Sequence, residues 1–326
     1  MMGSTTEVHP PQPFNTTIDS TIELPDSNSP DLHLAHPTPE ECITIWTSTS
    51  ASWRDSLTLP VYLTESQFLT TVPLAKDGGM TIWILDDKNL PLNKRPILCS
   101  CESFRKRSLT SDAAGNVREN IVHGIASVFC APQYRRRGYA ARHMKEMAKI
   151  LRHWQAEHGE PVGSVLYSDI GKEYYARLGW IPNATNTHFV FPPHRNETPQ
   201  LAREILEDDL QALCDQDKVT IRGAMATPAD AVSKRATILP DLDHMLWHIG
   251  KECFAAQYIF GGRHGKPWKA GVGYLDTPLL QPPGSGGRRQ RPVHSSPRRG
   301  GGCHCQQGSG KHLQIQCPGS GFCRAG

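Results

Sequence analysis

Three consecutive arginines and a glycine, Arg135-Arg136-Arg137-Gly138, are the residues of this sequence best suited to bind a charged ligand. They follow an apolar run that ends at Pro132, which has no N–H group to donate to a sheet. Apolar residues then recur at steps of three and four, which predicts one stripe along a helix: Ala140, Ala141, Met144, Met147, Ala148, Leu151 and Trp154. The first N–H groups of a helix lack internal partners and, with the helix dipole, favour an anion. The stretch from Val128 to Ala140 therefore predicts a strand, a phosphate-binding loop and a helix start.

Details of this loop argue against two common classes of phosphate site. It lacks the lysine and hydroxyl of a nucleoside-triphosphate loop, and it lacks the three-glycine spacing of a dinucleotide-binding loop. It does match the pattern Arg/Gln-x-x-Gly-x-Gly/Ala over Arg135–Ala140. This pattern resembles the acetyl-coenzyme A pyrophosphate loop of the GCN5-related N-acetyltransferase (GNAT) superfamily. A helix start that is simply charged on its surface is the alternative interpretation.

The order of the predicted elements extends the resemblance. Thr38, Pro39 and Glu41 predict a capped helix start, and Gly179 stands where a helix C-terminus is expected. Patterning predicts strands at 31–35, 78–87, 96–104, 117–129 and 163–168, a long helix from 140, a short helix at 169–178 and a last strand from His188. This is the order of the acetyltransferase fold, so we expect an α/β (α+β) protein with a GNAT-like mixed, mainly antiparallel sheet flanked by helices.

Two further sets of residues narrow the resemblance. The segment Tyr174-Tyr175-Ala-Arg-Leu-Gly179-Trp180 is similar to the aromatic-Tyr-x-x-x-Gly-aromatic segment that follows the fifth strand of the superfamily. Helices are predicted at 201–214 and 238–254, the second capped near Asp241 or Asp243. Three stretches, 38–41, 166–171 and 238–254, resemble fungal lysine N-acetyltransferases of the lysine-degradation pathway. In that family a second domain follows the acetyl-coenzyme A domain.

We therefore expect four regions along the chain. Residues 1–30, rich in Pro, Ser and Thr, are interpreted as a disordered lead-in. Residues 31–193 form the acetyl-coenzyme A domain, and 198–276 form part of a C-terminal substrate domain. Residues 277–326 are a low-complexity tail with almost no large apolar residues, and our hypothesis is that they derive from a retained intron or a frameshifted gene model.

Composition limits the possible functions. The 326 residues are 38% hydrophobic and carry a formal net charge of +3, with no basic stripe interleaved with aromatics to indicate nucleic-acid binding. No apolar segment is long enough to span a bilayer, and the first residues lack the apolar core of a signal peptide. The cysteines of the tail lack the paired spacing of a zinc site, so no metal is expected. We expect a cytoplasmic protein with reduced thiols that contacts neither nucleic acid nor membrane.

The resemblance implies a reaction in which an amine attacks the thioester of acetyl-coenzyme A. The amine must lose a proton, and the departing thiolate must gain one. Analogy gives the acid role to Tyr175, four residues before the glycine, whereas Tyr174 is expected in the core. For the base, three residues remain open: His123, Glu119 and Asp169, and a water relay could replace them all. Position 124 is glycine, near where the superfamily often carries a glutamate.

The same analogy implies how the co-substrate is held. Backbone around Val128 to Cys130 would pair with the pantetheine arm and supply the oxyanion donor. Ser168 would contact the arm, although Asp169 could instead cap the following helix. The full set of expected cofactor-binding residues is Val128, Phe129, Cys130, Arg135, Arg136, Arg137, Gly138, Tyr139, Ala140 and Ser168.

The predicted function is acetyl transfer from acetyl-CoA to the side-chain amine of free L-lysine. Another small amine or a protein lysine is the alternative acceptor. A different class of function is a catalytically dead coenzyme A-binding or truncated product.

Overall fold

The structure of this chain is a computed structural model, and it describes residues 23–183, 205–229, 233–259, 312–316 and 324–325. Its strands are β1 (Leu32–Ala35), β2 (Met80–Asp87), β3 (Cys99–Asp112), β4 (Val117–Phe129), β5 (Pro161–Ser168), β6 (Ile181–Pro182), β7 (Lys234–Ile238), β8 (His312–Gln316) and β9 (Arg324–Ala325). Its α-helices are α1 (Pro39–Trp53), α2 (Leu59–Leu69), α3 (Tyr139–Ile150), α4 (Glu173–Ala176), α5 (Leu210–Ala226) and α6 (Leu242–Ile259).

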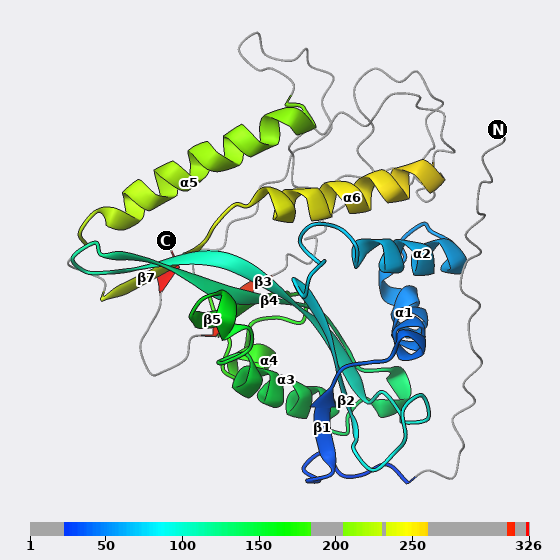
Figure 1. Cartoon of the computed structure of the whole chain (residues 1–326). Coiled ribbons are helices and arrows are strands. Elements are labelled where there is room, and N and C mark those ends of the chain that lie inside the picture. The colour runs from blue at the N-terminus through cyan, green and yellow to red at the C-terminus, as the bar shows by residue number, and fades with distance from the viewer. Residues whose placement is uncertain (1–22, 184–204, 230–232, 260–311, 317–323, 326) are drawn as a thin grey trace, which may run out of the picture.

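These strands form one mixed sheet that is mainly antiparallel, as the sequence predicted. Its order is β1-β2-β3-β4-β5-β8-β6, and β7 pairs with the far half of β3 and with β9. Only the β4–β5 and β7–β9 pairs are parallel among the described strands. The long hairpin of β3 and β4 runs through the whole molecule, so both halves of the fold are built on it (Figure 1).

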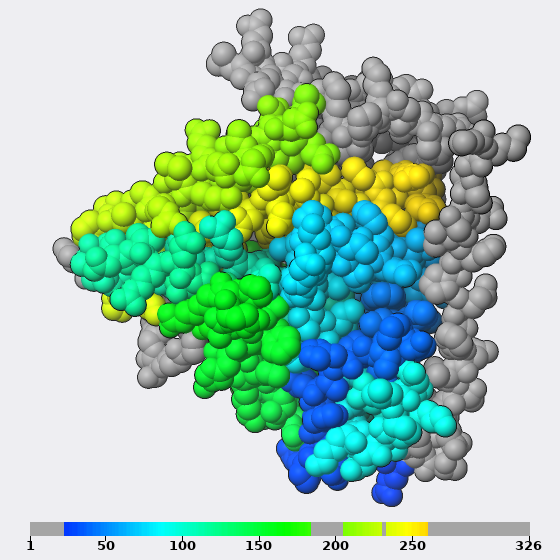
Figure 2. Space-filling model, in the orientation of Figure 1, coloured from blue at the N-terminus to red at the C-terminus, as the bar shows by residue number. Residues whose placement is uncertain are grey.

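Helices flank the sheet on both sides. α3 and α4 lie on one side, and α1, α2 and α6 lie on the other (Figure 1). The predicted stripe of α3 is confirmed, because Met144, Met147, Ala148 and Leu151 are buried in one cluster with Trp83. α6 lies along α2, and the rings of Phe254 and Phe68 stack with centroids 5.4 Å apart. The space-filling view shows α6 (yellow) resting on α2 (light blue), so the two helices form a continuous wall (Figure 2).

The N-terminus of α1 is fixed by buried charges. The predicted capping box is present, with reciprocal bonds between Thr38 and Glu41. The guanidinium of Arg95 donates to Glu41, with Nε 2.8 Å from Oε1, and also pairs with Asp86 at the end of β2. All three side chains are at most 5% exposed. Arg95 therefore joins α1 to the sheet in an environment that water does not screen.

The structure corrects the prediction of a helix over 169–178. α4 spans only Glu173–Ala176, because Gly171 adopts a φ of +81°, which no right-handed helix contains. The expected cap is also wrong in its residue. The hydroxyl of Ser168, and not the carboxylate of Asp169, accepts the N–H of Ile170 at 3.2 Å.

Later elements differ from the predictions as well. The helix predicted at 201–214 begins at Leu210 and continues to Ala226, and residues 201–204 lie outside the described residues. The start of the second predicted helix is confirmed, because α6 begins at Leu242, directly after Asp241, one of the two predicted caps. Ile238, included in the predicted segment, belongs instead to β7. β7, β8 and β9 were not predicted, and the strand predicted from His188 lies outside the described residues.

Arg95→Met should lower the free energy of unfolding by about 3–5 kcal/mol, because it leaves the buried carboxylates of Glu41 and Asp86 without a counter-charge. Urea denaturation at neutral pH measures the change. Lys88→Met is the matched control, since the Lys88–Asp31 ion pair is about half exposed and its loss should change stability little. Equal midpoints for both variants would contradict the importance of the buried pair.

Candidate functional site

β4 and β5 separate before either strand ends. They pair in parallel from Ile121 to Ile125 of β4, and β5 continues to Ser168 with β8 paired to its other edge. Beyond Ile125, β4 continues to Phe129 with pairing only to β3 on its other edge. Ser127 interrupts it with a φ of +55°, beside a register shift against β3. The last residues of β4 are at least partly exposed, so one edge of backbone donors and acceptors is open among the described strands.

The loop after β4 presents a row of free N–H groups. Arg136 (φ +63°) and Gly138 (φ +85°) are left-handed, and Gly138 is the N-cap of α3 without a side-chain cap. No acceptor in the described part of the chain takes the backbone N–H of any residue from 136 to 141. Successive N–H groups in alternating backbone conformations form a concave anion site, or nest. The geometry therefore agrees with a loop that binds an anion.

The side chains of this loop have unequal roles. Arg135 holds the loop itself, because its Nε donates to the carbonyl of Cys130 at 2.9 Å and its guanidinium lies 5.7 Å from the ring centre of Phe129. Arg136 and Arg137 are exposed. The ring of Tyr139 is buried, so this residue can offer a ligand only its backbone. Ala140, next in the helix, is partly buried.

Gly138 is constrained by the fold before any ligand is considered. Its positive φ strains any other residue, and a Cβ here would lie 2.6 Å from Oγ of Ser27. The segment that contains Ser27 is tied across the start of α3, since Tyr139 donates its hydroxyl to the carbonyl of Pro25 at 2.6 Å. Arg142 donates to the carbonyl of Ser27 at 3.1 Å. Substitution of Gly138 would thus disturb packing as well as a ligand.

The two tyrosines of α4 lie beneath the point where β4 and β5 separate. Tyr175 is 7% exposed and packs in one cluster with Ile125 and Leu166, the last paired residues of the two strands. Burial raises the pKa of Tyr175, so its hydroxyl keeps its proton. Tyr174 is partly buried and contacts Tyr175 edge to face at 5.0 Å. Ser168, nearby on β5, is buried with its hydroxyl bonded to the backbone of Ile170.

The three base candidates from the sequence do not lie together. His123 is fully buried on the α3 side, 3.3 Å from Gln155, and burial lowers its pKa to about 4. Glu119 is exposed and paired with Arg222 and Arg107, whose hydrogen bonds lower its pKa. It stands six residues from Ile125, about 20 Å along an extended strand.

Asp169 is exposed at the end of β5. Its position is five residues beyond Ser164, the β5 residue that pairs with His123.

Glu102 is a carboxylate that the sequence analysis missed. It lies on β3 opposite Ala126, accepts a hydrogen bond from the hydroxyl of Ser127 at 2.9 Å, and is only partly exposed. Burial raises its pKa, while Ser127 and Lys251 oppose the shift. Ala126, directly across from it, is exposed, so the carboxylate faces an open part of the sheet. A lone acid within the apolar strand 96–104 was the available signal.

Gly124 leaves space for a side chain of the neighbouring strand, which its sequence position did not indicate. A Cβ there would lie 2.8 Å from Cε of Lys106, so the glycine makes room for this lysine over the sheet. Nζ of Lys106 is 3.0 Å from Nε2 of His244 on α6. Burial lowers the pKa of Lys106 to about 8 and that of His244 to about 3.

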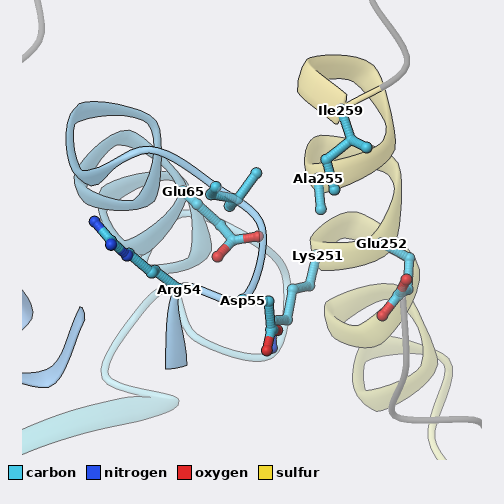
Figure 3. A pocket seen from close by; sticks show the side chains of 8 residues that line it. Arg54, Asp55, Glu65, Lys251, Glu252, Ala255 and Ile259 are labelled. Carbon is cyan, nitrogen blue, oxygen red and sulfur yellow. The ribbon is translucent and has the colours of Figure 1, made fainter. Parts of the chain in front are cut away.

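Another buried acid, Glu65, lies on α2. Glu65 is 2% exposed, and its Oε1 has no hydrogen-bond partner within the described residues. Burial raises its pKa to about 7; Lys251 opposes this shift, and Asp55 and Glu252 add to it. It lines a cleft between α2 and α6 (Figure 3).

Metal-ligand clusters and membrane-spanning helices are both absent from the described part of the chain. No three His, Cys, Asp or Glu side chains come together there as ligands for a metal ion. None of the helices in that part is both long and apolar enough to cross a bilayer.

Sequence comparison places this chain among known proteins. Residues 188–289 match the model of a family described as "LYC1 GNAT-like C-terminal domain". The chain is also 22% identical over 221 residues to a protein of Yarrowia lipolytica named lysine acetyltransferase. That alignment covers 53% of this chain and 56% of the relative, so the chain spans about half the length of the curated relative it matches.

Structure comparison finds acetyltransferases at low identity. A GCN5-related N-acetyltransferase from Kribbella flavida is 16% identical with a TM-score of 0.35, covering 62% of this chain and 46% of that one. A GNAT-family acetyltransferase from Brucella melitensis, solved with acetyl-CoA, is 17% identical with a TM-score of 0.31, covering 46% of this chain and 82% of that one.

The stability of this chain should depend on pH through Glu65. Its carboxyl holds a proton in the folded state up to about pH 7, whereas the unfolded chain releases it near 4.5, so the free energy of unfolding should fall as pH rises across this window. Glu65→Gln should remove a fall of about 3 kcal/mol. Urea denaturation between pH 4.5 and 8 measures it, with Glu160→Gln as the exposed control. Parallel profiles for wild type and Glu65→Gln would refute the burial argument.

Proposed function

We propose that this chain is an acetyl-coenzyme A-dependent N-acetyltransferase whose acceptor is the side-chain amine of free L-lysine. One observation carries the proposal: the open edge of β4 leads directly into the row of free N–H groups at residues 136–141. A linear molecule with an extended amide arm and a diphosphate matches these two features in sequence. The arm can add to the open edge as a strand does, and the diphosphate can accept from the nest.

The residues present fit such a co-substrate. The backbone of 126–130 offers donors and acceptors for the arm, and Arg136 and Arg137 are exposed beside the nest to attract the diphosphate. Tyr139 and Ala140 would contribute backbone N–H groups, because neither side chain is exposed. Ser168 remains a candidate contact, although its hydroxyl already accepts from Ile170.

The acceptor must first become neutral. A free lysine amine has a pKa of about 10.4, so about one in 2,500 is neutral at pH 7, at a cost of roughly 4.6 kcal/mol. Its nitrogen then attacks the thioester carbonyl carbon, a C–N bond forms and the C–S bond breaks. Two proton transfers complete the balance: the nitrogen loses one to a base, and the sulfur gains one from an acid.

We assign the base to Glu102 and the acid to Tyr175. Glu102 is the acidic side chain that faces the open part of the sheet beside β4, and the hydroxyl of Ser127 fixes its orientation. Tyr175 lies on the opposite side, at the point where β4 and β5 separate, with its proton retained by burial. One group therefore serves each face of the gap between the strands. His123, Glu119 and Asp169 are not needed in this scheme.

Lysine as the acceptor is supported by the name of one relative. The Yarrowia lipolytica protein carries the name lysine acetyltransferase, and the matched family is described by its GNAT-like C-terminal domain. Buried and partly buried acids on the acceptor side, Glu102 and Glu65, also suit a cationic substrate.

Release of coenzyme A thiol tests the proposed function. Purified protein is mixed with acetyl-CoA and L-lysine, ornithine, cadaverine or a lysine-containing peptide, and we expect the fastest release with L-lysine. Faster transfer to another amine would move the assignment to that acceptor. Calorimetry with coenzyme A is the parallel measurement: binding without turnover would indicate a catalytically dead module, and no binding by folded protein would overturn the proposal.

Glu102→Gln should lower kcat by about a hundredfold while coenzyme A affinity stays within about twofold, because a general base contributes roughly 10²–10⁴ to rate. The loss should shrink at pH values below the raised pKa of Glu102, because its carboxyl is then protonated in the wild type and cannot accept a proton from the amine. Glu119→Gln is the matched control on the adjacent strand, and it should keep kcat within about twofold of wild type. The reverse pattern would return the base to Glu119.

A further inference from the structure

We propose that the cleft between α2 and α6 binds the α-amino-acid end of the acceptor, with the α-ammonium at Glu65 and the α-carboxylate at Lys251. This inference rests on the proposed function and adds to it a reason for selecting a free amino acid. It would make the protein discriminate against amines that lack either α-group.

The cleft is formed by two elements far apart in sequence. One wall is the end of α1 with the following turn and α2, and the other wall is α6 (Figure 3). The cleft is small and partly open to solvent, with about 20 Å³ available to the centres of water-sized molecules. Glu65 points into it from α2, while Ala255 and Ile259 face it from α6 (Figure 3).

Glu65 is the feature that calls for a ligand. Its side chain is buried at 2% exposure, and its Oε1 meets no donor within the described residues. A buried carboxylate without donors is costly, and an ammonium group supplies donors and the opposite charge together. An α-ammonium placed at this oxygen would satisfy both needs.

The cleft also offers positive charge. Lys251 lines it together with the acids Asp55, Glu65 and Glu252, whereas the guanidinium of Arg54 points away from α6 (Figure 3). A lining with both signs suits a zwitterion better than a simple diamine, which would leave Lys251 facing a like charge. The apolar side chains nearby fit the carbon chain between the charged ends.

The position of the cleft relative to the end of β4, where the thioester is proposed to lie, supports the same ligand. Lys251 lines the cleft, and its charge opposes the rise in the pKa of both Glu65 and Glu102. At the other side, the ring of Trp53, just before Arg54, lies 5.8 Å from that of Phe129 at the end of β4. A side chain anchored by its α-groups in the cleft would therefore extend toward the end of β4, where the thioester is proposed to lie.

Discrimination among acceptors tests this site in the full-length protein. We measure kcat/KM for L-lysine, for cadaverine, which lacks the carboxylate, and for Nα-acetyl-lysine, which lacks the α-ammonium. Loss of one charged hydrogen bond costs about tenfold or more, so wild type should prefer L-lysine to each analogue by at least about tenfold. Lys251→Met should reduce the preference over cadaverine to within about threefold. Glu65→Gln should do the same for the preference over Nα-acetyl-lysine.

Three outcomes decide the inference. Equal use of L-lysine and cadaverine by wild type would overturn it, and so would full discrimination in both variants. Either result would leave the proposed acetyl transfer to amines standing. Lys149→Met, on the far side of the sheet, is the control and should keep the wild-type preferences. If no amine is acetylated, the proposed function fails separately, and calorimetry of L-lysine with wild type and Glu65→Gln then tests the cleft alone: equal heats would overturn it.

Discussion

The early separation of β4 from β5 is the constraint on which the rest of the site depends. Parallel strands normally satisfy each other's backbone groups, and here the pairing stops at Ile125 while β4 continues. Backbone donors without partners are costly when water is excluded, so this edge favours a ligand that pairs as a strand does. The positive φ of Ser127 turns β4 at the same place. The polypeptide therefore leaves β4 in the direction of the start of α3, where the nest lies.

The same irregularity links the two faces of the sheet. Because Ser127 departs from regular β geometry, its hydroxyl reaches Glu102 on the neighbouring strand at 2.9 Å. Glu102 faces the wall of α1, α2 and α6, whereas Tyr175 belongs to the core under α3. The position of that wall depends in turn on Arg95, which anchors the start of α1 by buried charge. Backbone irregularity and buried ion pairing thus together position the proposed acid and the proposed base on opposite faces of the sheet.

Local patterning was enough to predict the loop and α3, because their signals lie within a few consecutive residues. The periodicity of Met144, Met147 and Leu151 needs no knowledge of the partner that buries them. Contacts across long separations could not be predicted in this way. Ser127 meets Glu102 only through a register shift in the sheet, and the burial of Glu65 depends on α6, nearly two hundred residues later. The helix predicted at 169–178 failed because one glycine, Gly171, takes a left-handed conformation.

Glu65 shows how function and stability oppose each other in this fold. A buried acid with an unpartnered oxygen weakens the folded state above its pKa, and an apolar or amide side chain of similar size would remove that cost. Lys251 compensates only in part, since it is also close enough to stabilise the charge on Glu102. Because Lys251 is the cation close to both Glu65 and Glu102, negative charge is in excess along the wall of α2 and α6. A cationic substrate would neutralise this negative charge on binding, so relief of the cost of the unpartnered oxygen would contribute to the affinity for the acceptor.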